Sequence, residues 1–380
     1  MGARDEDSAR PRRRVLEWVA MRRVVLALVP MLSLAAAACG GGGTTVPDGS
    51  LVDARPDGPA DASPCDEPVA DTIPMKLGET GLCTDASCQS IAADVSPYEP
   101  RWHLWSDGAE KRRWIRLPPC KKIDTTDMDH WVFPPGTKLW KEFTRDGVRV
   151  ETRLYQKIGA DVNDWSKVAY VWNEGQTEAV ATPTRADDVL GTQHDVPSRA
   201  DCAKCHDSVA SGDRILGFSA LQLDYDAPAG MLDLDGLIEQ QLVSAPPAGS
   251  ASPHFPLPDA GDSPVALDVI GYLHANCGHC HNPNSTVTES MHAAFEVRLD
   301  IARLGSLDGT PTYTSLIGKT ALAPFGGNTV LVVPGHPEQS VVISRFIDDN
   351  PAKRMPPLAT EIHDPTALAN LRAWITQLGQ

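Results

Sequence analysis

Two five-residue segments carry cysteine and histidine at a spacing that suits a metal-bearing cofactor. Residues 202–206 read Cys-Ala-Lys-Cys-His, and residues 277–281 read Cys-Gly-His-Cys-His. On a helical turn the histidine falls on the same face as the first cysteine, four residues before it. Two thiols can then add to the vinyl groups of a haem while the imidazole coordinates its iron, which is the attachment pattern of c-type haem. We therefore predict two covalently bound haems, held by Cys202, Cys205, His206, Cys277, Cys280 and His281.

Two other uses of these cysteines are a zinc site and a pair of local disulfides. Two Cys-x-x-Cys pairs can supply the four thiolates that zinc prefers. Both alternatives leave the histidine that follows each pair unexplained, and the haem interpretation accounts for it twice.

Met355 is the predicted sixth ligand of the second iron. After the first motif, methionine occurs only at positions 231, 291 and 355. Met291 follows His281 by ten residues and is too close to the proximal side, whereas two prolines after Met355 can hold an extended loop against the haem. Ligation by histidine and methionine raises the reduction potential, and filled axial positions favour electron transfer.

The sixth ligand of the first iron is left open by the sequence. Met231 is the leading candidate, and His194, His103 and His254 are the others. A vacant position is a further alternative, and it would allow chemistry at the iron. His279, inside the second motif, is expected to be a solvated side chain that does not coordinate.

The N-terminus predicts export. Residues 21–23 read Met-Arg-Arg, and an apolar stretch from Val24 to Ala38 leads into Cys39. Such a stretch is typical of a secretory signal and is shorter than the roughly 20 residues of a membrane span. Residues 36–39 resemble a bacterial lipobox, so we expect a lipid on Cys39 that anchors the protein on the periplasmic side of a membrane. Cleavage by an ordinary signal peptidase is the alternative.

Charge and composition limit the partners. The chain has 34 basic and 50 acidic residues, a formal charge of −16. Removing residues 1–38, with seven basic and four acidic side chains, leaves about −19. This charge repels nucleic acid, so we expect no nucleic-acid partner. Residues 39–72 are rich in glycine, proline, alanine and aspartate, and are expected to be a flexible tether.

Four cysteines lie outside the haem motifs and the lipobox. They are Cys65, Cys83, Cys88 and Cys120. An even number in an exported protein predicts two disulfides. Cys83 and Cys88 could close a short loop, but the sequence leaves the pairing open.

Residues 98–182 are predicted to be all-β. Residues 148–155 alternate apolar with charged or polar side chains, the pattern of a half-buried strand. Further strands are expected at 113–117, 131–133, 138–143 and 168–172, with turns at 134–136 and 146–147. Seven of the nine tryptophans fall between Trp102 and Trp172. We interpret them as a β core, with a carbohydrate platform as the alternative.

Helical patterns surround both motifs. Residues 197–245 are expected to be helical, with an amphipathic segment at 232–242. Ser263-Pro264 and Asp364-Pro365 each read as an N-cap followed by proline at the first helical position. The first of these helices runs into the second motif and the other can pack on it, with a strand at 329–333 between them. This is the outline of a class I cytochrome c domain.

The predicted fold class is α+β multidomain, with an N-terminal all-β domain, a helical first-haem segment and a C-terminal class I cytochrome c-like α domain. The expected parts are a signal peptide (1–38), the tether (39–72), a β-rich domain (73–196), the first haem-binding segment (197–260) and the cytochrome c-like domain with the second haem (261–380).

Several short motifs, in order, resemble a family of exported bacterial dihaem c-type cytochromes. They are 104–112 (starting Leu-Trp-Ser-Asp-Gly-Ala), 133–137 (Phe-Pro-Pro-Gly-Thr), Trp172-Asn173 with Gln176-Thr177, Pro197-Ser198-Arg199 and Arg354-Met355-Pro356-Pro357. The resemblance covers roughly residues 95–378 and implies a shared architecture and two haems. It implies no particular substrate.

Two charged groups of residues suggest weaker hypotheses. The basic group comprises Lys111, Arg112, Arg113, Arg116, Lys121 and Lys122. It could pair with haem propionates or guide an acidic redox partner, and a solvated strand face is the ordinary alternative. The acidic group, Asp224, Asp226, Asp233 and Asp235, could hold calcium, but its spacing does not match an EF-hand loop.

These observations together predict an exported electron carrier. Electrons would pass between the two haems and redox partner proteins that the sequence does not identify. The alternative is a dihaem peroxidase-type enzyme in which one iron is open. A looser alternative is that the β region binds a substrate or a dehydrogenase, whose electrons the haems remove.

Overall fold

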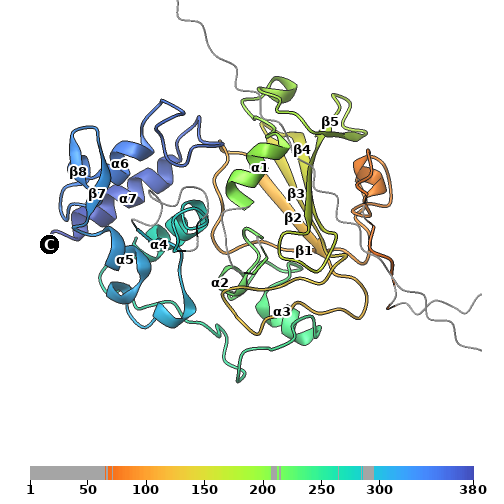
Figure 1. The fold of residues 1–380 in the computed structure, drawn as a ribbon, viewed down its shortest axis with the longest axis horizontal. Helices are drawn as coiled ribbons and strands as arrows, with labels where there is room; N and C mark the ends of the chain where they lie inside the picture. Colours follow the sequence, from red (N-terminus) through yellow and green to blue (C-terminus); the bar gives the residue numbers. More distant parts are fainter. Residues whose placement is uncertain are drawn as a thin grey trace, which may run out of the picture. The chain divides into compact units, whose positions relative to one another are not determined.

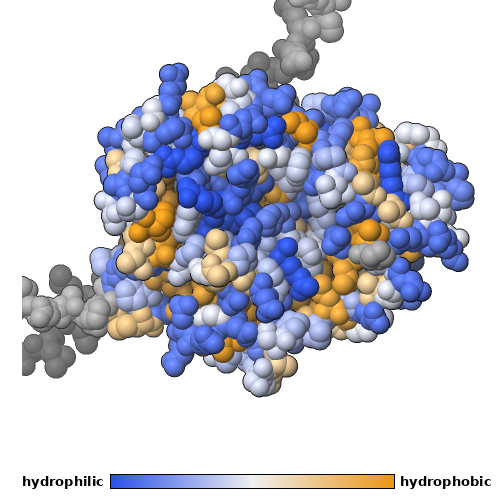
Figure 2. Space-filling model, turned by 180° about the vertical axis from the view of Figure 1, so that it is seen from behind, coloured by the Kyte–Doolittle hydropathy of each residue, from blue (hydrophilic) through white to orange (hydrophobic). Residues whose placement is uncertain are grey.

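The computed structural model describes residues 65, 67–70, 72–206, 212–213, 215–263, 265–283, 285 and 295–380. The predicted signal peptide, Cys39, tether residues 39–64, Pro264 and Met291 lie outside the described residues. What is described belongs to one compact unit, Pro59–Gln380. Figure 2 shows one face of the molecule, on which hydrophilic side chains predominate and apolar patches lie between them.

A six-stranded antiparallel sheet, with its strands in chain order, is the main β element (Figure 1). Its strands are β1 (Ser96–Pro97), β2 (Glu110–Arg116), β3 (Lys138–Arg145), β4 (Val148–Lys157), β5 (Trp165–Trp172) and β6 (Ala179–Thr182). The strands expected at 113–117, 138–143, 148–155 and 168–172 are confirmed. The strand expected at 131–133 is wrong. Only Val132 forms an isolated bridge, to Asp124, because two prolines that cannot donate ladder hydrogen bonds follow directly.

Alternation along the strands gives the sheet two unlike faces. On one face, Trp114 lies opposite Trp140, and Trp140 lies opposite Leu154. These side chains are buried against the preceding segment, through Leu77 and Leu82. The other face carries Ile115, Leu139 and Tyr155 at one end, and they pack with Phe218 and Leu232 of the helical region.

The tryptophan-rich region is a β core, as predicted. Five of its tryptophans are at most 8% exposed, namely Trp114, Trp131, Trp140, Trp165 and Trp172. Two disulfides close loops beside this core, Cys65–Cys120 and Cys83–Cys88. The two expected disulfides are therefore present, and the pairing that the sequence left open is assigned.

The described residues of the range 197–245 include non-helical segments and form three short helices. They are α1 (Arg199–His206), α2 (Ala220–Leu223) and α3 (Leu234–Glu239). The helix expected at 232–242 is shorter at both ends. Leu232 bridges Tyr98 in an extended conformation, and Val243 bridges Ile123. Pairing with the β region thus limits α3 to the residues after its N-cap, Asp233.

The C-terminal part is helical around a small hairpin. Its elements are α4 (Ala266–Asn276), α5 (Pro311–Leu316), β7 (Thr320–Phe325), β8 (Asn328–Val330), α6 (Val341–Phe346) and α7 (Pro365–Gln377). The strand expected at 329–333 is displaced and shorter, because after Val330 the chain changes partner: the Leu331 amide donates to the Lys319 carbonyl and Val332 forms an isolated bridge with Ile317. Helices α4 and α7 pack on one another through Val269, Leu273, Leu371, Trp374 and Ile375.

The predicted start of α7 is confirmed and that of α4 is not. The Asp364 carboxylate accepts hydrogen bonds from the amides of Thr366 and Ala367, which caps α7. Helix α4 begins at Ala266, and the Ser263 hydroxyl instead donates to the side-chain oxygen of Gln377, tying the two helices together. Among the described residues, no helix has both the length and the apolar composition that crossing a membrane requires.

Candidate functional site

The first Cys-x-x-Cys-His segment forms the second half of α1. Ser198 and Asp201 cap this helix reciprocally, since each backbone amide donates to the other's side chain. Cys202, Cys205 and His206 therefore lie within one continuous helical stretch. The imidazole of His206 packs against the ring of Tyr155 on the sheet, with ring centroids 4.8 Å apart.

The second segment follows directly on α4. Cys277 is the C-cap of α4. Its carbonyl accepts hydrogen bonds from the amides of Cys280 and His281, and these bonds hold the motif in a tight turn. Gly278 is required here, because a Cβ at this position would lie 2.7 Å from the His274 carbonyl oxygen. The imidazole of His281 stacks on Phe295, with ring centroids 4.0 Å apart.

The two motifs, distant in sequence, border one pocket. It encloses about 780 Å³ of space outside protein atoms, part of it open to solvent. The motif residues that line it are Lys204, Cys205, Cys277, His279, Cys280 and His281. Its remaining lining is mainly apolar and comprises Leu104, Trp105, Asn276, Met355, Pro356, Pro357 and Leu358. Met355, the predicted sixth ligand of the second iron, thus lies at the same pocket as the histidine it would face.

The Leu-Trp-Ser-Asp-Gly segment holds this pocket together. Asn276, just before the second motif, accepts a hydrogen bond from the Trp105 amide at 2.6 Å. The Trp105 indole donates to the Ile362 carbonyl at 2.7 Å, and the Asp107 carboxylate accepts from the Ile362 amide at 2.8 Å. The segment therefore ties the end of α4 to the loop that carries Met355.

Burial disfavours the ionised form of two thiols at the pocket. Burial raises the pKa of Cys205 to about 12, with a contribution from Cys280, and the same two causes raise the pKa of Cys277 to about 12. Within the described ranges, no three His, Cys, Asp or Glu side chains form a group that suits a metal ion.

The prediction that His279 is solvated is wrong. Its side chain lines the pocket, and burial lowers its pKa to about 4. His279 lines the pocket because it lies within the tight turn of the second motif, and the spacing of cysteines and histidines in the sequence does not show this turn.

The candidates for the first iron's sixth ligand are spread over the described structure. His194 is 2% exposed and bonds Glu151 at 2.8 Å, and Met231 is 38% exposed. His103 pairs with Glu99 and His254 with Asp235. None of the four lines the pocket of Cys205 or the one that Cys202 borders. Met75 does line the latter pocket, and the sequence argument missed it by considering only methionines after the motif.

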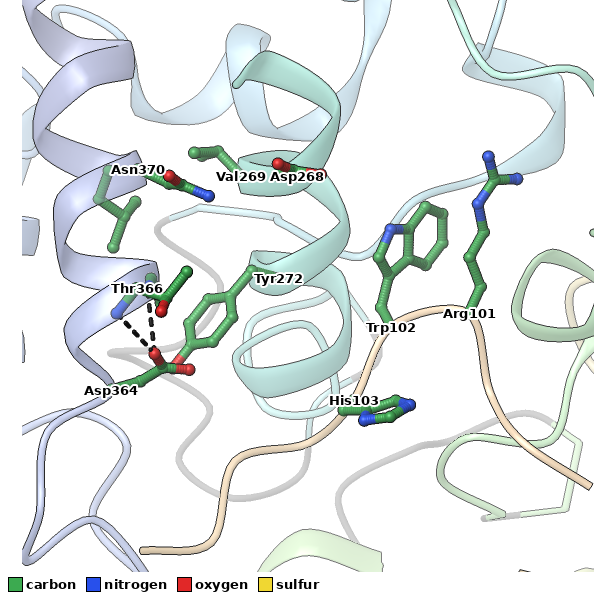
Figure 3. A pocket seen from close by; sticks show the side chains of 11 residues that line it. Arg101, Trp102, His103, Asp268, Val269, Tyr272, Asp364, Thr366 and Asn370 are labelled. Carbon is green, nitrogen blue, oxygen red and sulfur yellow. Dashed lines mark hydrogen bonds between the residues drawn. The ribbon is translucent and has the colours of Figure 1, made fainter. Parts of the chain in front are cut away.

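His103 borders a different pocket, of about 650 Å³, between α4, α7 and residues 101–103 (Figure 3). Tyr272 extends from α4 toward Asp364 at the start of α7, and Trp102 lies on the other side of α4. The pocket contains none of the motif cysteines, so it is separate from the site described above.

The basic and acidic groups predicted from the sequence both contain residues with partners within the described protein. Within the basic group, Arg112 pairs with Glu142, and Arg116 with Glu67 and Asp94, whereas Arg113 is 4% exposed. In the acidic group, Asp224 accepts from two backbone amides, Asp233 caps α3 and Asp235 bonds His254. These bonds give three of the four aspartates a structural role without calcium.

Comparison with known proteins adds no relative. The chain matches no protein-family model, and no significant match is found among curated proteins or among solved structures.

Proposed function

We propose that this protein is an exported dihaem c-type cytochrome that carries electrons, with one haem on each Cys-x-x-Cys-His segment. The observation that carries the proposal is the shared pocket, because both motifs and Met355 line it although they come from distant parts of the chain. Its mainly apolar lining suits a porphyrin, and the histidine that directly follows each cysteine pair suits coordination of its iron.

Each protein group has a definite task in this proposal. Cys202 with Cys205, and Cys277 with Cys280, would hold the haems by thioethers, and His206 and His281 would supply proximal nitrogens. Met355 would complete the second iron, held in place by the hydrogen bonds of Trp105 and Asp107 to the following loop. Bound haem iron supplies one-electron redox chemistry. The apolar residues of the pocket would shield part of a bound haem from water.

Export is part of the proposal. The disulfides Cys65–Cys120 and Cys83–Cys88 suit an oxidising compartment, as does haem attachment through thioethers. We infer that the protein resides on the periplasmic side of a bacterial membrane, anchored through a lipid on Cys39, and exchanges electrons with redox proteins there.

A potentiometric titration of the haem-loaded protein, followed by magnetic circular dichroism and electron paramagnetic resonance, tests the proposal. We expect two reversible one-electron steps and a methionine-to-iron transition from one haem. Because both motifs border one pocket, the oxidised spectrum should also differ from the sum of two single-haem variants, C202A/C205A and C277A/C280A. Absence of reversible reduction, or strictly additive spectra, would contradict it.

The same spectra distinguish the peroxidase alternative. None of the four predicted sixth ligands (Met231, His194, His103 and His254) lines either pocket that the first motif borders. A haem iron on the first motif could therefore lack a sixth protein ligand. High-spin iron that persists after partial reduction, together with turnover of hydrogen peroxide, would favour that enzyme over the electron carrier.

A further inference from the structure

Three basic side chains form a row across the middle of the sheet. Arg113 of β2 lies directly opposite Lys141 of β3, and Lys141 lies directly opposite Arg153 of β4. Lys111 lies two residues before Arg113, on the same face. Like charges placed directly opposite each other on neighbouring strands destabilise a sheet. This arrangement therefore requires a compensating partner.

Burial makes the row more costly. Arg113 is 4% exposed, and burial lowers its pKa. Burial also lowers the pKa of Lys141 far below its usual value, with contributions from Arg113, Lys111 and Arg153, and lowers that of Lys111 to about 7. Burial is the largest cause of all three low pKa values, and for the two lysines the neighbouring cations add to it.

Of the three cations in the row, only Arg153 has its charge balanced by a carboxylate of the described residues. Arg153 bonds Glu151 at 2.5 Å. Within the described part of the chain, neither Arg113 nor Lys141 makes an ion pair, and the Lys141 ammonium lies over the Phe143 ring, 5.1 Å from its centroid. The opposite face behaves differently, since Arg112 and Arg116 of the same strand β2 both have carboxylate partners.

The row lies on the sheet face that contacts the first Cys-x-x-Cys-His motif. Tyr155, two residues after Arg153 and on the same face, packs on His206 with ring centroids 4.8 Å apart. Cys205 of this motif in turn lines one pocket with the second motif. The compensating partner must therefore lie near both motifs. Arg113 is 4% exposed and the Arg153 side chain is 30% exposed, so the row suits a small anionic group that enters between the sheet and the motifs better than the surface of a docking protein.

We propose that Arg113, Lys141 and Arg153 form a carboxylate-binding site for the propionates of the haems held by the two motifs. This inference rests on the proposed function, since only bound haem brings propionates to the sheet. Thioether attachment uses the vinyl groups and leaves the two carboxylates of each haem intact. Guanidinium groups bind carboxylates through two parallel hydrogen bonds, and an ammonium adds a compact charge, so the row offers both modes.

Lys141→Met and Lys138→Met make a matched pair for the test. Both lysines belong to β3 and lose the same charge, but Lys138 lies on the opposite face, opposite Arg116, and its ammonium donates to the Thr80 carbonyl. The experiment uses the full haem-loaded chain with ¹³C-labelled propionates. It measures the reduction potentials and the infrared difference spectrum between the reduced and oxidised states.

We expect Lys141→Met to shift the labelled carboxylate bands and to lower at least one potential. Loss of a cation favours the ferric state by about tenfold in the reduction equilibrium, roughly 59 mV for one electron. Lys138→Met should leave the bands unchanged and shift the potentials less. Lys141→Arg should restore the bands, which separates loss of charge from a change in folding.

Equal effects of the two methionine variants, or unchanged labelled bands in Lys141→Met, would overturn the inference while leaving two reversible haems in place. A phosphate-dependent shift in the wild-type potentials that Lys141→Met abolishes would also overturn it, because the row would then bind a soluble anion. A protein without covalent haem would instead contradict the proposed function itself.

Discussion

At the scale of single residues, the candidate site depends on a few hydrogen bonds between segments far apart in the chain. The sequence singles out the cysteines, histidines and Met355 because their types and spacing suit haem attachment, and the structure places both motifs and Met355 at one pocket. The supporting bonds of Trp105 and Asp107 to Ile362 join positions about 255 residues apart, and no local pattern predicts such contacts. Lys141 and Arg153 were missed for the same reason, since strand register places them beside Arg113.

Replacing Met355 by histidine should lower the reduction potential of one haem by something on the order of 0.1 V, within the roughly 0.8 V range that axial ligands cover. Histidine in place of methionine favours the ferric state. Redox titration measures the change, and Met128→Leu, a methionine packed against the sheet-face core outside the pocket, is the control. An unchanged potential would show that Met355 is not a ligand.

Removing the Asp107 carboxylate should loosen the Met355 loop. Asp107 has a positive φ of 48°, so glycine is the replacement that avoids backbone strain, and asparagine is the control that keeps an acceptor for the Ile362 amide. Asp107→Gly should cost about 1–3 kcal/mol of unfolding free energy. Imidazole should also displace the methionine from the iron more readily in Asp107→Gly. Equal imidazole affinity in both variants would refute the role of this bond.

At the scale of elements, strand and helix patterns in the sequence were informative where one face is buried. The alternation at 148–155 predicted β4, and Asp364-Pro365 predicted α7, because the signals are local. The pattern at 232–242 overestimated α3, because pairing of Leu232 with Tyr98 competes with helix formation. Tertiary pairing, which the sequence does not display, decided that boundary.

A buried ion pair joins the segment after the first motif to the sheet. Lys157 at the end of β4 contacts Asp213 at 2.5 Å, and neither side chain is exposed. The same carboxylate accepts from the Trp165 indole. Asp213→Asn should lower the free energy of unfolding by roughly 3–5 kcal/mol, because it leaves a buried ammonium without its charge partner.

Denaturant unfolding of the haem-loaded protein measures this loss. Asp94→Asn is the control, since Asp94 is 60% exposed where it pairs with Arg116, and an exposed pair contributes only about 0–1 kcal/mol. Similar losses in both variants would contradict the importance of burial.

The histidine inside α4 should make stability depend on pH. Burial, with Arg298 and His279, lowers the pKa of His274 to about 3, below the roughly 6.5 of an unfolded histidine. Between these values the unfolded chain binds the extra proton, so stability falls as the pH falls through that window, by up to about 1.4 kcal/mol per pH unit. His274→Gln keeps an acceptor for the Leu299 amide and should flatten this dependence in unfolding experiments. An unchanged slope would contradict it.

At the scale of the whole molecule, the central feature is that the two motifs lie at the same pocket although they are far apart in the sequence. The sheet, the described short helices and the C-terminal helical part place two motifs at one pocket, near a row of cations on the sheet of which Arg113 is buried. The sequence displays two Cys-x-x-Cys-His motifs, but not that they share a pocket, because that depends on tertiary contacts such as those of Trp105 with Asn276 and Ile362.

The mass of the intact protein, matured in a host that attaches c-type haem, tests the account most directly. We predict a mass increase of two haems for the wild type, and of one haem for each of C202A/C205A and C277A/C280A. A wild-type mass without covalent haem, or with a single haem that both double variants retain, would contradict it.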